Sequence, residues 1–111
     1  MSPKEYLSHV AAVILQAIAH GYKYGFDVMD VTGLPSGTIY PALRRLEEMG
    51  LVKSSWEKEK IAQREQRPPR KYYEVTAAGE QALAAAIKRY KTLEHMLPEA
   101  PAKAKPSRER G

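Results

Sequence analysis

One stretch of the sequence constrains the fold more than any other: residues 36–53, SGTIYPALRRLEEMGLVK. Ser36 is a residue type that caps helix N-termini, and Gly50 is the type that ends helices in a left-handed conformation. Between them, apolar residues recur at spacings of four and three, which places them on one helical face: Ile39, Leu43, Leu46 and Met49. The next two residues begin an extended run. The stretch therefore predicts a short amphipathic helix followed directly by a strand.

The opposite face of this helix carries its polar and aromatic groups: Tyr40, Arg44, Arg45, Glu47 and Glu48. Pro41 lacks a backbone N–H and fits best in the first turn of a helix. Either Ser36 or Thr38 is therefore the cap, and the second choice keeps Pro41 inside the first turn. In both cases Pro41 marks the N-terminal end, which is the end that a recognition helix presents to base edges.

Two further helices are expected before this one. Ser2, Pro3 and Glu5 form a helix start, and the helix runs to about Ala19. Its apolar stripe comprises Leu7, Val10, Ile14 and Ile18. Residues 24–31 predict a second, short helix with Phe26, Val28 and Met29 pointing inward, and Gly33, Leu34 and Pro35 form the following turn. Helix, short turn and helix at this length are typical of a helix-turn-helix, although an ordinary helical hairpin is an alternative.

A charged hairpin is expected after the candidate recognition helix. Residues 51–58 and 70–76 predict two strands, and the segment between them is polar and ends in two prolines. Residues 53–71 contain seven basic and three acidic residues, a net charge of +4 out of +5 for the whole chain. A solvated loop is the plain interpretation of such a charge run. Because these cations flank a candidate recognition helix, contact with DNA phosphates is favoured.

Taken together, these residues resemble the PadR family of bacterial winged-helix transcription regulators. The resemblance covers about residues 10–90 and rests on a compound motif: Gly21, Tyr22, Tyr40, Pro41, Leu43, Arg45, Leu46, Glu47, Gly50, Leu51, Val52, Arg70, Tyr72, Tyr73, Thr76 and Gly79. Val75 stands where the family usually has leucine. The resemblance implies a repressor whose dimer, in some members of the family, binds a flat apolar effector. Trp56 is a candidate lining residue for such an effector, or a simple packing residue of the wing.

A last helix is expected from Ala77 to about Met96, with Thr76 as its cap. Its apolar stripe has no obvious partner in a three-helix core, which indicates a dimer interface. Together with the first helix, the expected interface comprises Leu7, Val10, Ile14, Leu83, Ile87, Tyr90, Leu93 and Leu97. The alternative is that this helix folds back on its own core. The domains are therefore a winged helix-turn-helix (1–76), a dimerisation helix (77–97) and a disordered tail (98–111).

Composition excludes several classes of function. The chain has 111 residues, which indicates one domain, and its net charge of +5 is compatible with nucleic-acid binding. It has no cysteine, and its three histidines, His9, His20 and His95, lack metal-ligand spacing. No phosphate-binding glycine loop or nucleophile elbow is present, so neither an enzyme nor a cofactor is expected. No apolar run is long enough to span a membrane and no signal peptide is recognised, so a cytoplasmic protein is expected.

The predicted fold is mainly α with a small β-wing: a winged helix-turn-helix plus a C-terminal dimerisation helix. The predicted function is transcriptional regulation by a homodimer that binds an inverted repeat in double-stranded DNA. The residues expected to contact DNA lie on the recognition helix and the wing: Ser36, Thr38, Tyr40, Arg44, Arg45, Arg67, Arg70 and Lys71. The rival interpretation is a winged-helix module that binds another protein and no DNA.

Overall fold

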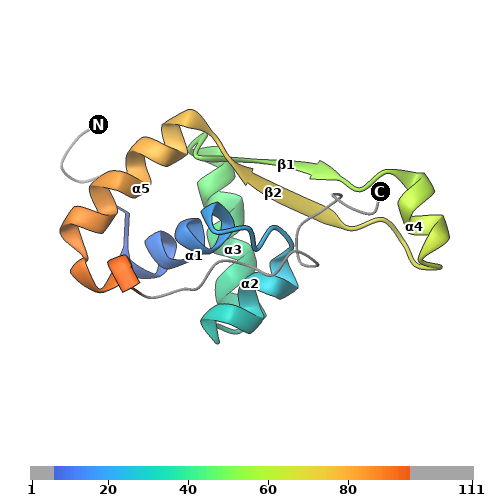
Figure 1. The fold of residues 1–111 in the computed structure, drawn as a ribbon, viewed down its shortest axis with the longest axis horizontal. Helices are drawn as coiled ribbons and strands as arrows, with labels where there is room; N and C mark the ends of the chain where they lie inside the picture. The colour runs from blue at the N-terminus through green and yellow to red at the C-terminus, as the bar shows by residue number, and fades with distance from the viewer. Residues whose placement is uncertain (1–6, 96–111) are drawn as a thin grey trace.

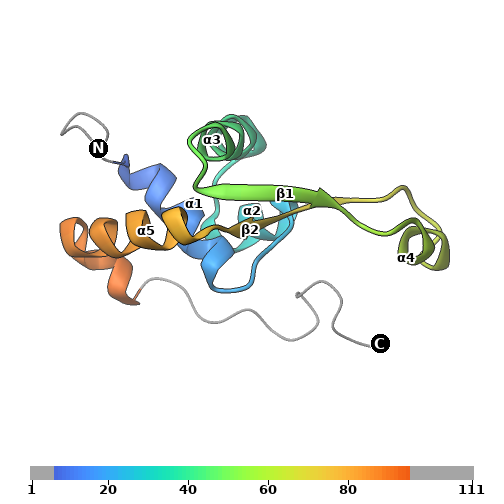
Figure 2. The ribbon, with the colours of Figure 1, turned by 90° about the horizontal axis from the view of Figure 1, so that it is seen from above.

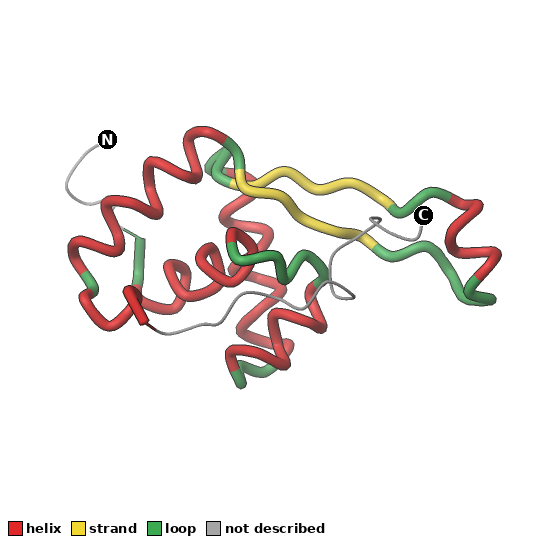
Figure 3. Tube along the Cα trace, in the orientation of Figure 1, coloured by secondary structure: helices red, strands yellow, loops and turns green. Residues whose placement is uncertain are grey.

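Helices make up most of residues 7–95, the part of the chain that the computed structural model describes (Figure 1; element types are coloured in Figure 3). One two-stranded antiparallel sheet completes the domain. The elements in chain order are α1 (His9–Ala19), α2 (Gly25–Thr32), α3 (Ser36–Glu48), β1 (Val52–Trp56), α4 (Glu59–Arg64), β2 (Lys71–Val75), α5 (Ala77–Arg89) and the 3-10 helix η2 (Lys91–His95). The prediction of a mainly helical fold with a small wing is confirmed.

Helix α1 is the central element of the core. Its residues 12–18 are all buried, and it contacts α2, α3, α5 and β2. Ser8 caps it by accepting a hydrogen bond from the Ala11 N–H at 3.1 Å. The predicted start at Ser2 lies outside the described residues, but a continuous helix from there is wrong, because Leu7 and Ser8 precede α1 in extended or irregular backbone. A helix that is apolar on all sides is expected at the centre of a domain.

Helices α2 and α3 form the predicted helix-turn-helix. Gly33 ends α2 with a φ of +76°, a left-handed conformation that glycine adopts readily. Val28 is fully buried and Met29 is half-buried, as expected. Phe26, which was predicted to point inward, is instead 45% exposed. Its place in the first turn of α2 turns it toward the wing, where the Arg70 guanidinium lies 5.0 Å from its ring centroid.

Helix α3 buries the predicted apolar face at Ile39, Leu43 and Leu46 and ends as predicted at Gly50, whose φ is +77°. The Gly50 N–H donates to the Glu47 carbonyl and the Leu51 N–H to the Leu46 carbonyl, both at 3.0 Å, which is the Schellman arrangement.

Three details of α3 differ from the prediction. Pro35 occupies the N-cap position and Ser36 is already helical, so neither Ser36 nor Thr38 caps the helix. Pro41 therefore lies beyond the first turn. Met49 is 43% exposed because it is the C-cap residue, where the chain leaves the core.

Strands β1 and β2 form the wing, with Val52 opposite Val75, Ser54 opposite Tyr73 and Trp56 opposite Lys71. The wing extends away from the helical body, and α4 lies at its far end (Figure 1 and Figure 2). The short helix α4 was not predicted, because the segment was interpreted as an irregular polar loop. Its Ala62 is buried, and Gln66, which follows its C-cap, has a φ of +59°.

Helix α5 begins as predicted at its cap, where the Thr76 hydroxyl accepts from the Gly79 N–H at 3.0 Å. It ends at Arg89 instead of Met96, and the 3-10 helix η2 follows. This segment turns back onto α1: the Tyr90 hydroxyl donates to the Leu7 carbonyl at 2.8 Å, and the Gln16 side chain donates to the Leu93 carbonyl. A polar side chain buried in α1 thus secures η2.

The packing of the segment after α5 against α1 affects the predicted dimer interface. Four of its residues are buried within the single chain: Leu7, Ile14, Leu83 and Leu93. Their apolar surface is covered within the core of this chain. Val10 is 38% exposed, Ile87 and Tyr90 are half-buried, and Leu97 lies outside the described residues, as does the tail 98–111.

Candidate nucleic-acid interface

The exposed face of α3 presents the predicted DNA-contacting side chains to solvent. Ser36, Arg44 and Arg45 are exposed, Tyr40 is 44% exposed, and Thr38 is half-buried. Tyr40 and Arg44 are four residues apart and therefore lie one above the other on the helix surface. The buried Leu43 and Leu46 fix the opposite face against the core. Core packing therefore sets the direction in which Tyr40 and Arg44 point.

Tyr40 lies against the first residue of α2. A Cβ atom built on Gly25 would be 2.5 Å from the Tyr40 hydroxyl oxygen and 2.6 Å from a ring carbon. These distances are shorter than van der Waals contact, so only glycine at position 25 allows the tyrosine ring to occupy this place. The start of α2 and the exposed face of α3 are thereby joined.

A groove of about 310 Å³ lies where α2, α3 and the wing meet. Aromatic rings and two cations line it: Tyr24, Gly25, Phe26, Tyr40, Arg70, Lys71 and Tyr73. Three of the predicted DNA contacts, Tyr40, Arg70 and Lys71, come from separate parts of the sequence and are brought together here. At its outer side the Lys71 ammonium lies 5.9 Å from the ring centroids of both Tyr73 and Trp56. Trp56 is 65% exposed, so it does not line an enclosed effector site in this chain.

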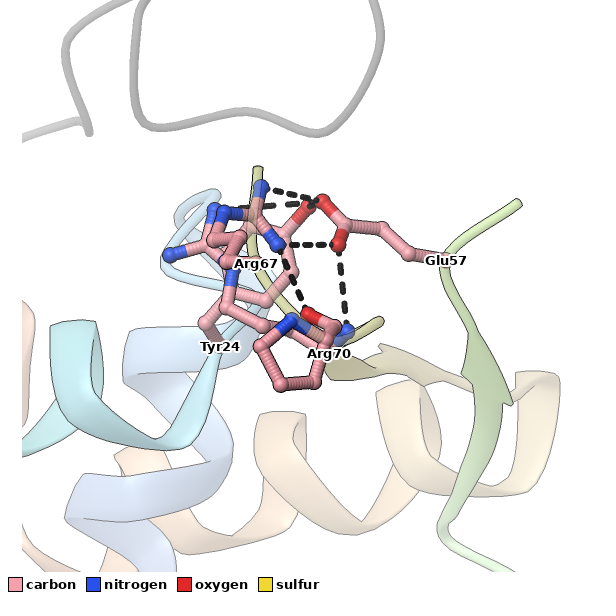
Figure 4. Close-up of polar contacts among 5 residues, drawn as sticks. Tyr24, Glu57, Arg67 and Arg70 are labelled. Atoms are coloured by element: carbon pink, nitrogen blue, oxygen red, sulfur yellow. Dashed lines mark hydrogen bonds and ion pairs between the residues drawn. The ribbon is translucent and has the colours of Figure 1, made fainter. Parts of the chain in front are cut away.

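The outer end of the two-stranded sheet is organised by Glu57, which directly follows β1 (Figure 4). Glu57 is the only buried acidic residue in the described part of the chain. Arg67 binds it in a bidentate manner, Nη1 to Oε1 at 2.6 Å and Nη2 to Oε2 at 3.0 Å. The Tyr24 hydroxyl donates to Oε2 at 3.2 Å, and the Arg70 backbone N–H donates to Oε1 at 3.1 Å. One carboxylate therefore holds three segments together.

These contacts fix the charges around Glu57. Hydrogen bonding from Arg67, with further contributions from the Arg70 backbone N–H and Tyr24, lowers the pKa of Glu57 to about 2, although burial opposes this shift. Burial, followed by the neighbouring Glu57 charge, raises the pKa of Tyr24 to about 12. At neutral pH the site therefore contains a carboxylate, a neutral phenol and two guanidinium groups.

The two arginines of this cluster have different environments. Arg67 was predicted to contact DNA phosphates, but its guanidinium forms an ion pair with Glu57. Arg70 stacks on aromatic rings, with its guanidinium carbon 4.2 Å from the Tyr24 ring centroid, and its Nη2 lies 3.8 Å from Glu57 Oε2. Four further cations of the wing are exposed: Lys53 near its base, and Lys58, Lys60 and Arg64 farther out. Sequence reasoning missed Glu57 and Tyr24 as site residues, because Glu57 was one of three acids in a basic segment and nothing marked it as buried.

Other kinds of site find no support in the described residues. No group of three or more histidine, aspartate or glutamate side chains within residues 7–95 is arranged to hold a metal ion. In that same part of the chain, no helix has the length and apolar character required to cross a membrane.

The comparisons with known proteins agree with this geometry. A PadR-like transcription factor from Bacteroides fragilis is 28% identical, with a TM-score of 0.61 over 77% of this chain and 82% of that chain. The protein smu.1704 from Streptococcus mutans UA159 is 25% identical, with a TM-score of 0.64 over 77% and 78%. A PadR family transcription regulator from Clostridium difficile R20291 shares the fold at 24% identity, with a TM-score of 0.66 over 78% and 92%.

No sequence among the curated proteins matches the chain. The family model described as the transcriptional regulator PadR-like family, however, matches residues 12–85, which is more than half of the chain. Sequence and fold agree, and the chain belongs to the transcriptional regulator PadR-like family.

Proposed function

We propose that the chain is a sequence-specific regulator that binds double-stranded DNA as a homodimer and represses transcription from an inverted-repeat operator in the bacterial cytoplasm. The observation that carries the proposal is the convergence of Tyr40 on α3 with Arg70 and Lys71 of the wing around one groove. A helix with exposed arginines beside a basic wing matches the way winged helices approach a duplex. The rings of Tyr24 and Phe26 pack against the Arg70 guanidinium, and the rings of Trp56 and Tyr73 lie near the Lys71 ammonium.

In this proposal α3 enters the major groove. Arg44 reads a base edge, because a guanidinium can donate two hydrogen bonds to a guanine. Ser36, Thr38 and the free N–H groups at the start of α3 contact phosphates. The exposed wing cations at Lys58, Lys60 and Arg64 extend the phosphate contacts along the duplex. Arg45 and Lys71 complete the cationic surface.

The homodimer is proposed on geometric grounds. Two copies related by a two-fold axis place two recognition helices in successive major grooves, about 34 Å apart. The apolar surface that α1 and α5 leave partly exposed in the described chain supports such a contact, and it comprises Val10, Ile87 and Tyr90. An apolar effector that alters the angle between the two copies would release them from the operator.

The test is a selection of duplexes from a random-sequence pool by the purified full chain at physiological salt, with its mass in solution measured in parallel. Enrichment of an inverted repeat by a dimer supports the proposal, and affinity for that duplex should fall steeply as salt rises. Failure to enrich any sequence contradicts it and favours the rival, a winged-helix module that binds another protein.

A further inference from the structure

Glu57 is an anomaly on a surface that is proposed to face DNA. It is buried in the most basic segment of the chain, and its charge is the one that a phosphate backbone repels. A carboxylate is costly to bury unless its hydrogen-bonding capacity is met. The contacts it makes therefore indicate what it does.

Both carboxylate oxygens of Glu57 are fully used. Oε1 accepts from Arg67 Nη1 and from the Arg70 backbone N–H, and Oε2 accepts from Arg67 Nη2 and the Tyr24 hydroxyl. The backbone N–H of Glu57 in turn donates to the Arg70 carbonyl at 2.8 Å. The β1–β2 ladder ends at the pair Trp56 and Lys71. At the next position the Arg70 N–H binds the Glu57 side chain instead of the backbone carbonyl that would continue the ladder. Glu57 closes the sheet and begins the wing tip.

The same carboxylate ties the wing to the helix-turn-helix. Tyr24 is the N-cap residue of α2, and it also forms a β-bridge with Tyr72 on the outer side of β2. Next to it, the Tyr73 N–H donates to the Lys23 carbonyl at 2.9 Å. Backbone hydrogen bonds therefore attach β2 to the start of α2. Glu57 adds a side-chain attachment from the end of β1, because its carboxylate accepts the Tyr24 hydroxyl.

Arg70 is the residue whose position depends most on this arrangement. Its backbone is held by Glu57 on both the N–H and carbonyl sides, and its guanidinium lies between the Glu57 carboxylate and the Tyr24 and Phe26 rings. Within the described residues no hydrogen bond occupies the guanidinium, which faces the groove beside Tyr40. Its Nε is buried without a hydrogen-bond partner, whereas the side chain as a whole is 35% exposed, so the terminal nitrogens are the donors left for a phosphate.

We propose that Glu57 is a positioning residue for DNA binding: it fixes the wing against the first turn of α2 and aims Arg70 at the duplex, although its own charge opposes DNA. The inference rests on the proposed function, and it adds a residue that touches no DNA. Arg67 neutralises the Glu57 charge, so that the cluster of Glu57, Arg67 and Arg70 has a net charge of +1.

Two interpretations of Glu57 predict opposite results for Glu57→Gln. If only net charge mattered, the loss of a negative charge would tighten DNA binding and leave the salt dependence unchanged or steeper. If Glu57 positions the wing, the substitution leaves Arg67 without its partner and places an amide donor against a guanidinium. Binding should then weaken about tenfold, and the salt slope should become shallower by about one phosphate contact.

The experiment measures affinity for two probes, the random-sequence duplex pool and the duplex enriched from it, at several salt concentrations. The full chain is compared with Glu57→Gln and with the matched control Glu59→Gln. Glu59 lies two residues away in the same wing, is exposed, and loses the same charge on substitution. We expect the control to bind as tightly as the parent chain or slightly more tightly. Equal or tighter binding by Glu57→Gln than by Glu59→Gln overturns the proposal.

A second variant keeps the test decisive if Glu57→Gln does not fold. Tyr24→Phe removes one donor to Glu57 without changing any charge, and we expect about threefold weaker binding. Amide hydrogen exchange without DNA is measured on the same proteins. Faster exchange of the Arg70 and Tyr73 amides in the variants is the expected sign of a loosened wing, and unchanged exchange overturns the positioning role. If the parent chain binds neither probe, the proposed function fails, whereas the exchange result still judges the attachment of the wing.

Discussion

The recognition helix and the wing are adjacent in the fold but are held by different forces. Helix α3 is fixed by Ile39, Leu43 and Leu46, each 1% exposed or less. The wing hairpin buries Val52 at its base and Tyr73 in the middle, and at its outer end Trp56 is 65% exposed. There a single carboxylate, Glu57, takes the place of an apolar core.

The difference shows two ways of orienting a DNA-reading surface. Apolar burial is non-directional and is spread over many side chains, so it tolerates the replacement of one apolar residue by another of similar volume. A hydrogen-bonded carboxylate is directional and depends on each partner, because a buried charge left without its partner is costly. Mutations in the core of α3 should therefore lower the stability of the whole domain, whereas mutations at Glu57 should change the position of the wing.

The largest effect is expected from Leu43→Ala. Leu43 is fully buried, so the substitution should lower the free energy of unfolding by ~2–5 kcal/mol through lost transfer energy and a cavity. Trp56→Ala is the contrast, since a side chain that is mostly exposed should change it by less than ~1 kcal/mol. Urea unfolding followed by far-UV circular dichroism measures both. Comparable losses in the two variants would contradict the distinction between body and wing.

The second prediction uses acid to release the wing. The pKa of Glu57 is lowered from an ordinary 4.5 to about 2. Folding therefore favours its charged form, and the stabilisation is complete above pH 4.5 and is lost as the pH falls toward about 2. The contribution is on the order of 2–3 kcal/mol, which is less than the core of α3 provides.

Trp56 is the only tryptophan of the chain and adjoins Glu57, so its fluorescence reports on the wing, whereas circular dichroism at 222 nm reports on the helices. We expect the fluorescence to change over this pH range before helical signal is lost. Glu57→Gln is the control, because it removes the titrating group and should abolish the separate fluorescence transition. A single transition shared by both signals in the parent chain would show that wing and body unfold together.

Periodicity predicted the elements that are held by apolar burial. The spacing of Ile39, Leu43 and Leu46 identified α3, and Thr76 identified the start of α5. The ends of helices were less predictable. The stripe that runs past Arg89 was interpreted as a free dimer face, but a break at Tyr90 allows Leu93 to pack on α1. An apolar spacing shows that a face is buried and does not show which surface buries it.

The polar organisation of the site was harder to predict. Tyr40, Arg70 and Lys71 were each predicted to contact DNA, but only the fold shows that they line one groove. The roles of Glu57 and Tyr24 depend on contacts across 33 residues of sequence, which no local pattern reveals. Helix α4 was missed because its six residues are mostly polar and are too few to show a helical periodicity. Ala62 is its one buried residue.

The third prediction separates base recognition by α3 from phosphate contact by the wing. Arg44→Ala on α3 should weaken binding of the selected duplex by ~1–3 kcal/mol and relax the preference for one base position. Arg64→Ala in α4 should weaken binding to all sequences alike, because a wing cation meets phosphates. Selection from random duplexes with each variant measures both effects. If Arg44→Ala leaves every preference intact, the reading face of α3 has been assigned to the wrong residue.

The smallest effect is expected at Glu74, the other ion-paired acid of the hairpin, which sharpens the comparison within the hairpin itself. Glu74 on β2 lies 4.0 Å from both the Lys23 and Lys53 ammonium groups, and its side chain is 42% exposed against 5% for Glu57. Water and salt screen such pairs, so Glu74→Gln should change the free energy of unfolding by less than ~0.5 kcal/mol. Urea unfolding at low and high salt measures the change, with Glu57→Gln as the matched substitution. A loss at Glu74 as large as that at Glu57 would mean that the number of ion pairs, and not their burial, decides how firmly the wing is held.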